Sequence, residues 1–410
     1  MGCGTVTSTG SGNAAPLVVD GFPCAAGGGA NQINRPNTAY VSVQICAPGS
    51  TTNCQIIDHI IVDTGSPGLR IAAGALQSSL QPSTGALPIL AGAASGTAVT
   101  ECITYVSSYS YGPIVNADVY IAGEKVSNSS LQVYGSANYA APTDCSSQGG
   151  VETDTPAAVG GNGVFGVNFE TNDAYSLYFN CPPGNADACT LDSTYAGIPN
   201  VVSQFSTDNN GVTLSLPAVA ATGSTTPVVG TLYFGVGTQA NNMPSATTWS
   251  LPVDPNIADA SGSLNPGYLT FAATLSGTWT TAYLDSGTDV DYFTDAALAL
   301  CTSSPTNPYY GYFCPSTTQS VTFELAGTGT TSPAHALSYS VVSPTSLGYG
   351  ATAVAVADVA GATGASSTLT NTTFAFGLAS FFGHTVYVLF SGKTAPGTAI
   401  GGTGPIDGYD

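Results

Sequence analysis

Two segments of the sequence place an aspartate in the same short pattern, and paired aspartates can activate water. Residues 61–66 read IVDTGS, and residues 283–288 read YLDSGT. In each segment an apolar stretch ends at an aspartate, which is followed by a hydroxyl residue, a glycine and a second hydroxyl residue. Asp63 and Asp285 are therefore the candidate catalytic carboxylates.

This pattern suits acid–base chemistry. An apolar strand carries a carboxylate inward, glycine permits a tight turn with close backbone N–H groups, and hydroxyls hold the carboxylate oxygens in place. Two such loops facing each other would bring two carboxylates together, and the pair would then share one proton. The charged member could activate a water while the neutral member polarises a carbonyl.

A single Asp-hydroxyl-Gly triplet is usually an ordinary turn, so further shared features matter. Both copies follow an apolar run, and both are followed later by an apolar-apolar-Gly segment. In the first half this segment is VFG at residues 164–166, and in the second half it is AFG at residues 375–377. The coincidence favours two equivalent loops.

The organisation of the chain predicts an all-β fold with few short helices. Short runs rich in Val, Ile, Thr, Tyr and Phe are separated by Gly and Pro, and long helical patterns are absent. The second half repeats the order of elements in the first, which indicates a duplicated β unit. The expected divisions are a flexible tether at 1–15, a lobe carrying Asp63 at 16–240 and a lobe carrying Asp285 at 241–410.

The two loops and their later apolar-apolar-Gly segments resemble the pepsin-like aspartic proteases. The resemblance covers residues 39–390 and implies two β-barrel-like lobes with a substrate cleft between them. Segments such as DNNGVTLSLP, GTLYFGVGTQANN and GLASFFGHTVY are similar to a bacterial, secreted branch of that superfamily known only as a domain of unknown function.

The resemblance also implies roles for the loop residues. Thr64 and Ser286 would brace the two loops against each other, while Ser66 and Thr288 would hydrogen-bond the outer carboxylate oxygens. Gly65 and Gly287 complete the supporting set.

Two departures from the family pattern concern substrate binding. The hairpin flap is expected near 108–113, with Tyr111 or Tyr109 as its aromatic residue, but YGPIVNADVYIAG leaves a short hairpin without a Gly-rich tip. Arg70 stands where the family usually has Trp. It could pair with a carboxylate in the cleft or cap a strand edge.

Charge restricts the class of partner. The chain has four basic and 24 acidic residues, for a net charge of −20. Nucleic-acid binding and attachment to anionic membranes both need clustered Lys and Arg, so neither is expected. Few ion pairs can form, which predicts acid tolerance, although an acidic surface kept for solubility explains the charge equally well.

The ten cysteines favour disulfides in an oxidising compartment over a metal site, since Cys-x₂-Cys spacing is absent and only three His are present. The expected pairs are Cys46–Cys54, Cys181–Cys189, Cys301–Cys314 and Cys102–Cys145. Two alternatives remain for Cys3: lipidation, as at the processed end of a bacterial lipoprotein, or a disulfide with Cys24.

These observations predict a secreted, periplasmic or surface-exposed endopeptidase that acts at acid pH on peptide or protein substrates. No metal, cofactor or transmembrane segment is expected, and the chain should be a monomer. The alternative is a catalytically silent binding or surface protein that retains the fold.

Overall fold

The fold is built almost entirely from β-strands. The computed structural model describes residues 8–22, 35–254, 270–301, 304, 307–328, 333–363 and 373–410. Within these residues the α-helices are α1 (Thr143–Ser146), α2 (Pro156–Val159) and α3 (Pro344–Leu347), each a single turn. The expectation of an all-β fold is confirmed.

A ring of strands surrounds the interior of the first half. Its strands are β2 (Ala39–Cys46), β3 (Cys54–Asp63), β4 (Pro67–Ala72), β6 (Ser108–Ile121), β7 (Glu124–Tyr134) and β9 (Gly163–Val167). They pair in the order β6-β7-β4-β9-β3-β2, and a further pairing of β2 with β6 closes the ring. The long strand β6 also pairs with β5 (Ala98–Thr104) and β8 (Val151–Glu152), and β5 continues through β10 (Leu177–Cys181) to β11 (Thr190–Leu191).

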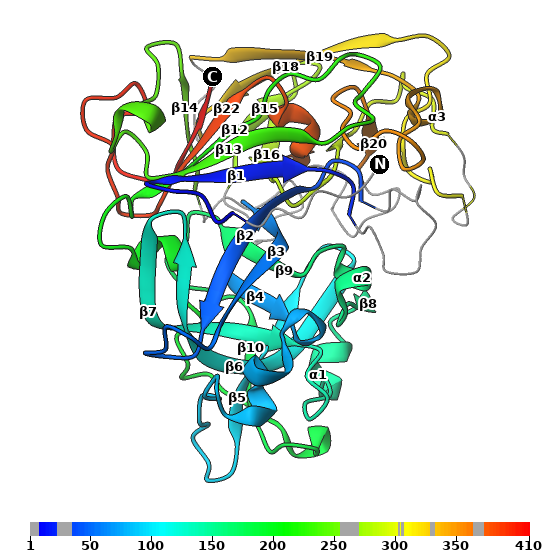
Figure 1. Cartoon of the computed structure of the whole chain (residues 1–410). Coiled ribbons are helices and arrows are strands. Elements are labelled where there is room, and N and C mark those ends of the chain that lie inside the picture. Colours follow the sequence, from blue (N-terminus) through cyan, green and yellow to red (C-terminus); the bar gives the residue numbers. More distant parts are fainter. Residues whose placement is uncertain are drawn as a thin grey trace.

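A run of antiparallel strands joins distant parts of the chain. It comprises β1 (Ala14–Val19), β13 (Val228–Phe234), β12 (Gly211–Ser215), β22 (Thr385–Leu389), β23 (Ile406–Tyr409) and β14 (Trp249–Pro252). In Figure 1 the blue strand β1 lies beside the green strands β12 and β13 in the upper half, while β5, β6 and β7 lie in the lower half. Strands assigned to the first predicted lobe therefore pair with strands of the second, through β12 and β22.

The end of the predicted tether belongs to this run. Strand β1 begins at Ala14, and the side chain of Asn13 is buried, donating to the carbonyl of Phe234 and to Asn241. Residues 1–7, including Cys3, lie outside the described residues, as does Cys24.

A second sheet of seven strands carries the second aspartate motif. Its order is β19 (His335–Val341), β18 (Gln319–Ala326), β15 (Phe271–Thr274), β16 (Thr280–Leu284), β21 (Phe374–Phe376), β17 (Asp291–Phe293) and β20 (Ala360–Ala362).

The same arrangement surrounds both aspartates. Strand β3 pairs in parallel with β9, the VFG strand, and β9 pairs antiparallel with β4, which follows the first motif. In the second sheet β16 pairs in parallel with β21, the AFG strand, and β21 pairs antiparallel with β17, which follows the second motif. The two halves of the chain thus place their motifs with equivalent strand topology.

All four disulfides expected from the sequence are present: Cys46–Cys54, Cys102–Cys145, Cys181–Cys189 and Cys301–Cys314. They indicate an oxidising, extracytoplasmic location. Among the described residues, no helix combines the length and apolar character needed to cross a membrane.

Candidate functional site

Two buried strands bring Asp63 and Asp285 to the meeting point of the sheets. Strand β3 is partly exposed where it begins, and its last five residues, ending at Asp63, are all buried. Strand β16 likewise ends in three buried residues, and the backbone N–H of Asp285 then donates to the carbonyl of Phe376 at 2.9 Å. The exposed fraction is 6% for Asp63 and 8% for Asp285, so both carboxylates are largely removed from water.

Each loop holds its own carboxylate in the same way. In the first, Gly65 N–H donates to Asp63 Oδ1 at 2.8 Å and the Ser66 hydroxyl donates to Oδ2 at 2.5 Å. In the second, Gly287 N–H donates to Asp285 Oδ1 at 2.8 Å and the Thr288 hydroxyl donates to Oδ2 at 2.7 Å. Two donors on each carboxylate fix the direction in which its oxygens point.

The loops are joined by four reciprocal hydrogen bonds. The Thr64 hydroxyl donates to the carbonyl of Leu284 at 3.0 Å and accepts from Ser286 N–H at 2.9 Å. The Ser286 hydroxyl donates to the carbonyl of Val62 at 2.7 Å and accepts from Thr64 N–H at 3.1 Å. Each hydroxyl spans from its own loop to the backbone of the other, which sets the separation of the two aspartates.

The glycines are required because both carboxylates lie against them. A Cβ atom on Gly65 would lie 2.9 Å from Asp285 Oδ1 and 3.1 Å from Asp63 Oδ1. A Cβ atom on Gly287 would lie 2.6 Å from Asp63 Oδ1 and 3.1 Å from Asp285 Oδ1. The inner oxygens of the two carboxylates therefore converge on the same small volume.

This convergence shifts a protonation equilibrium. The pKa of Asp63 is raised to about 7, first by burial, then by the charge of Asp285 and by a hydrogen bond between the two carboxyl groups. The bonds from Ser66 and Gly65 stabilise the charged form and oppose the shift. At acid pH the two carboxyl groups therefore hold one proton between them.

The family model described as protein of unknown function (DUF3443) matches residues 10–409. The chain belongs to this family. No curated protein matches it. Both aspartate loops of this DUF3443 protein lie inside the matched range, and the family description assigns them no role.

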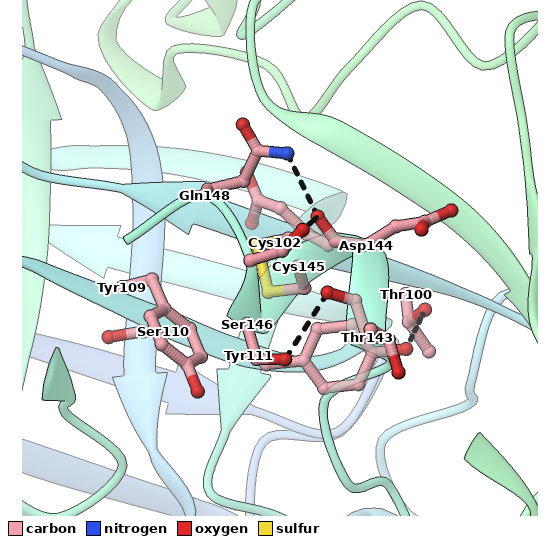
Figure 2. The surroundings of a disulfide bond; sticks show 12 residues. Thr100, Cys102, Tyr109, Ser110, Tyr111, Thr143, Asp144, Cys145, Ser146 and Gln148 are labelled. Atoms are coloured by element: carbon pink, nitrogen blue, oxygen red, sulfur yellow. Dashed lines mark hydrogen bonds between the residues drawn. A yellow bond between two sulfur atoms is a disulfide. The ribbon is translucent and has the colours of Figure 1, made fainter. Parts of the chain in front are cut away.

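The structure corrects the expected positions of the flap tyrosines. Figure 2 shows Tyr109 and Tyr111 beside the Cys102–Cys145 disulfide. Both rings are buried in an apolar cluster around this disulfide, and the Tyr111 hydroxyl lies 2.6 Å from Thr100 Oγ1. Because β6 alternates its side chains between two faces, these two tyrosines share the face that covers the disulfide.

A third tyrosine, which the sequence interpretation did not select, packs against Ile61 on the strand that ends at Asp63. Strands β5 and β6 form a hairpin in which Thr104 pairs with Tyr109, so Tyr105 is in the turn. Burial and the charge of Asp63 raise the pKa of Tyr105, whereas the Arg70 guanidinium lowers it. The Tyr105 hydroxyl is buried and has no hydrogen-bond partner among the described residues.

Arg70 is fully buried, so its side chain has no surface with which to bind a substrate. Its side chain has no exposed surface and donates to both carboxylate oxygens of Glu101, with Nη2 at 2.7 Å from Oε1 and Nε at 3.3 Å from Oε2. It also pairs with Asp173 and donates to the carbonyl of Pro67 at 2.8 Å. The two acidic partners are distant in sequence, which is why the pattern around Arg70 did not reveal them.

The second loop has an additional anchor just beyond Thr288. Asp289 Oδ2 accepts hydrogen bonds from the hydroxyls of Tyr312, at 3.0 Å, and Tyr349. Both rings are packed beside an apolar cluster containing Val290. Among the described residues, no group of three or more His, Cys, Asp or Glu side chains could hold a metal ion.

Proposed function

We propose that this protein is an aspartic endopeptidase in which Asp63 and Asp285 act on one water molecule. The observation that carries the proposal is the convergence of two carboxylates held by two equivalent, reciprocally bonded loops. Such a pair shares a proton, and this gives one general base and one general acid in the same site. The resemblance of both loops to those of pepsin-like proteases supports the same function.

The reaction follows from these protonation states. The ionised carboxylate takes a proton from water as the water oxygen bonds to the peptide carbonyl carbon. The neutral carboxyl gives its proton to the carbonyl oxygen, and a tetrahedral diol forms. The dyad then gives its proton to the amide nitrogen and takes one from a diol hydroxyl as the C–N bond breaks, so that a carboxylic acid and an amine leave and the dyad again holds one proton.

The substrate class follows from the reaction and from the location of the protein. A peptide or protein chain in extended conformation would present its carbonyl to the dyad, and the four disulfides support action outside the cytoplasm. The Tyr105 hydroxyl, which has no hydrogen-bond partner in the described part of the chain, offers a donor to a bound substrate or water.

The decisive experiment measures hydrolysis of an unfolded protein between pH 3 and pH 8, with and without a general aspartic-protease inhibitor. Asp63→Asn and Asp285→Asn should each reduce the rate at least about a thousandfold, because an amide cannot exchange the proton. Asp187→Asn, at an exposed position in the short helix Ala186–Ala188, is the matched control and should leave the rate unchanged.

Two results would reject the proposal. One is substantial hydrolysis by either dyad variant while its unfolding midpoint matches that of the parent. The other is absence of inhibitor-sensitive hydrolysis by the parent, which would favour a catalytically silent binding protein.

A further inference from the structure

A row of side chains crosses four strands beside the first aspartate. In the strand registers Ile61 on β3 lies opposite Val164 on β9, Val164 lies opposite Arg70 on β4, and Arg70 lies opposite Gln132 on β7. Directly paired residues share a face of the sheet, so these four side chains form one row. Asp63 is two residues beyond Ile61 and therefore lies on the same face of β3.

The β5–β6 hairpin is attached to this row at three points. Glu101 on β5 accepts two hydrogen bonds from the Arg70 guanidinium, and its backbone carbonyl accepts from Gln132 Nε2 at 2.8 Å. Four residues later, Tyr105 packs against the cluster that contains Ile61 and Val164. Arg70 and Gln132 thus bind strand β5, whereas Ile61 and Val164 pack against Tyr105 in the turn.

The Arg70–Glu101 pair is positioned to limit movement of the hairpin. A guanidinium bonded to both oxygens of one carboxylate fixes orientation as well as distance, which a lysine ammonium cannot do. Both side chains have no exposed surface, so separating them would leave two buried charges without their main partner. The Tyr178 hydroxyl donates to Glu101 Oε1 at 3.1 Å and stabilises the carboxylate further.

We propose that Arg70 and Glu101 are positioning residues, which clamp the hairpin at residues 104–108 so that Tyr105 stays packed against Ile61 and Val164, on the face of the sheet that carries Asp63. The clamp is a feature of the fold, whereas its effect on hydrolysis rests on the proposed function. Neither side chain has surface exposed to a substrate, so both act through the turn that carries Tyr105.

Asp173 provides a matched control within the same cluster. It pairs with the same guanidinium and, through its charge and a side-chain hydrogen bond, raises the pKa of Glu101. Its remaining side-chain partners are the Ser176 hydroxyl and the backbone N–H groups of Tyr175 and Ser176, none of which belongs to the hairpin. It therefore lies outside the hairpin. A cluster that serves only general stability would respond alike to loss of either carboxylate, whereas a clamp would respond to Glu101 alone.

The test measures amide hydrogen exchange by mass spectrometry in Glu101→Gln, Arg70→Lys and Asp173→Asn variants of the full chain. Exchange at residues 103–109 should rise at least about tenfold in the first two variants, relative to strands β18 and β19 of the other sheet. It should remain within about twofold of the parent in Asp173→Asn, because Glu101 keeps its bidentate partner. The kcat/KM for peptide hydrolysis should fall at least about tenfold in the first two variants only.

Three outcomes would overturn the clamp. They are unchanged hairpin exchange in Glu101→Gln and Arg70→Lys, an equal rise across the whole chain, or an equal effect of Asp173→Asn. Hydrogen exchange needs no substrate. If the protein shows no peptidase activity, the proposed function is rejected, and the exchange measurement still decides whether the clamp exists.

Discussion

Replacing Asp291 with asparagine should make the protein less sensitive to rising pH. The Asp291 carboxyl is 1% exposed, its Oδ2 accepts from the Ser380 hydroxyl at 2.9 Å, and its Oδ1 has no hydrogen-bond partner among the described residues. Burial raises the pKa of Asp291 from 3.8 to about 7, against the smaller opposing effect of the Ser380 bond.

The raised pKa of Asp291 fixes both the direction and the size of its effect on the free energy of unfolding. Since the folded pKa is above the unfolded one, the folded state holds the proton more tightly, and this contribution is fully present below about pH 4. It is lost as pH rises through about 7, and a shift of roughly three pKa units corresponds to about 4 kcal/mol. An asparagine side chain has nearly the same volume as aspartate and cannot ionise. The variant should therefore not lose this stability as the pH rises.

The assay is urea unfolding of the parent and of Asp291→Asn at pH 4 and at pH 8. We expect the free energy of unfolding of the parent to fall by about 4 kcal/mol more than that of the variant between these pH values. Asp187→Asn, at its exposed position, should show the parental pH dependence. An Asp291→Asn variant with the same pH dependence as the parent would show that this carboxyl ionises in the folded state without cost, and the reasoning from burial would fail.

Three further predictions concern the dyad and the disulfide framework. Gly287→Ala places a methyl group 2.6 Å from Asp63 Oδ1 and should abolish hydrolysis, whereas Gly401→Ala, whose nearest neighbouring atom is 3.9 Å away, should not. Because the dyad must hold one proton, kcat/KM should decline as pH rises through about 7, and a flat profile from pH 5 to pH 9 would contradict the shared-proton mechanism. Replacing both Cys102 and Cys145 with alanine opens a link across 43 residues and should lower the free energy of unfolding by about 4 kcal/mol in denaturant titrations; a change below about 1 kcal/mol would argue against it.

The geometry of the dyad could be predicted from sequence because its determinants are local. In each loop the hydroxyl three residues after the aspartate and the N–H two residues after it bond that same carboxylate, so a four-residue pattern specifies the turn. The reciprocal bonds of Thr64 and Ser286 join residues 222 apart, and only the duplication of the pattern pointed to them.

The hairpin and Arg70 could not be predicted in the same way. Tyr105, Tyr109 and Tyr111 are close in sequence, and the position of the turn decides which of them packs on the strand that ends at Asp63. That turn contains no glycine, so little in the sequence indicates where the chain reverses. The partners of Arg70 are 31 and 103 residues away, and a buried ion pair leaves no local pattern.

The joining run of strands bears on the order in which the molecule can assemble. Strand β12 lies between β13 and β22, so one of its edges remains open until residues 385–389 are available. An open strand edge is a template for association with other chains. Contacts of such long sequence separation also form slowly, because a large loop must close before they contribute. A nascent chain therefore exposes this edge from the time β12 is made until residues 385–389 follow, and the second aspartate loop is also made within that interval.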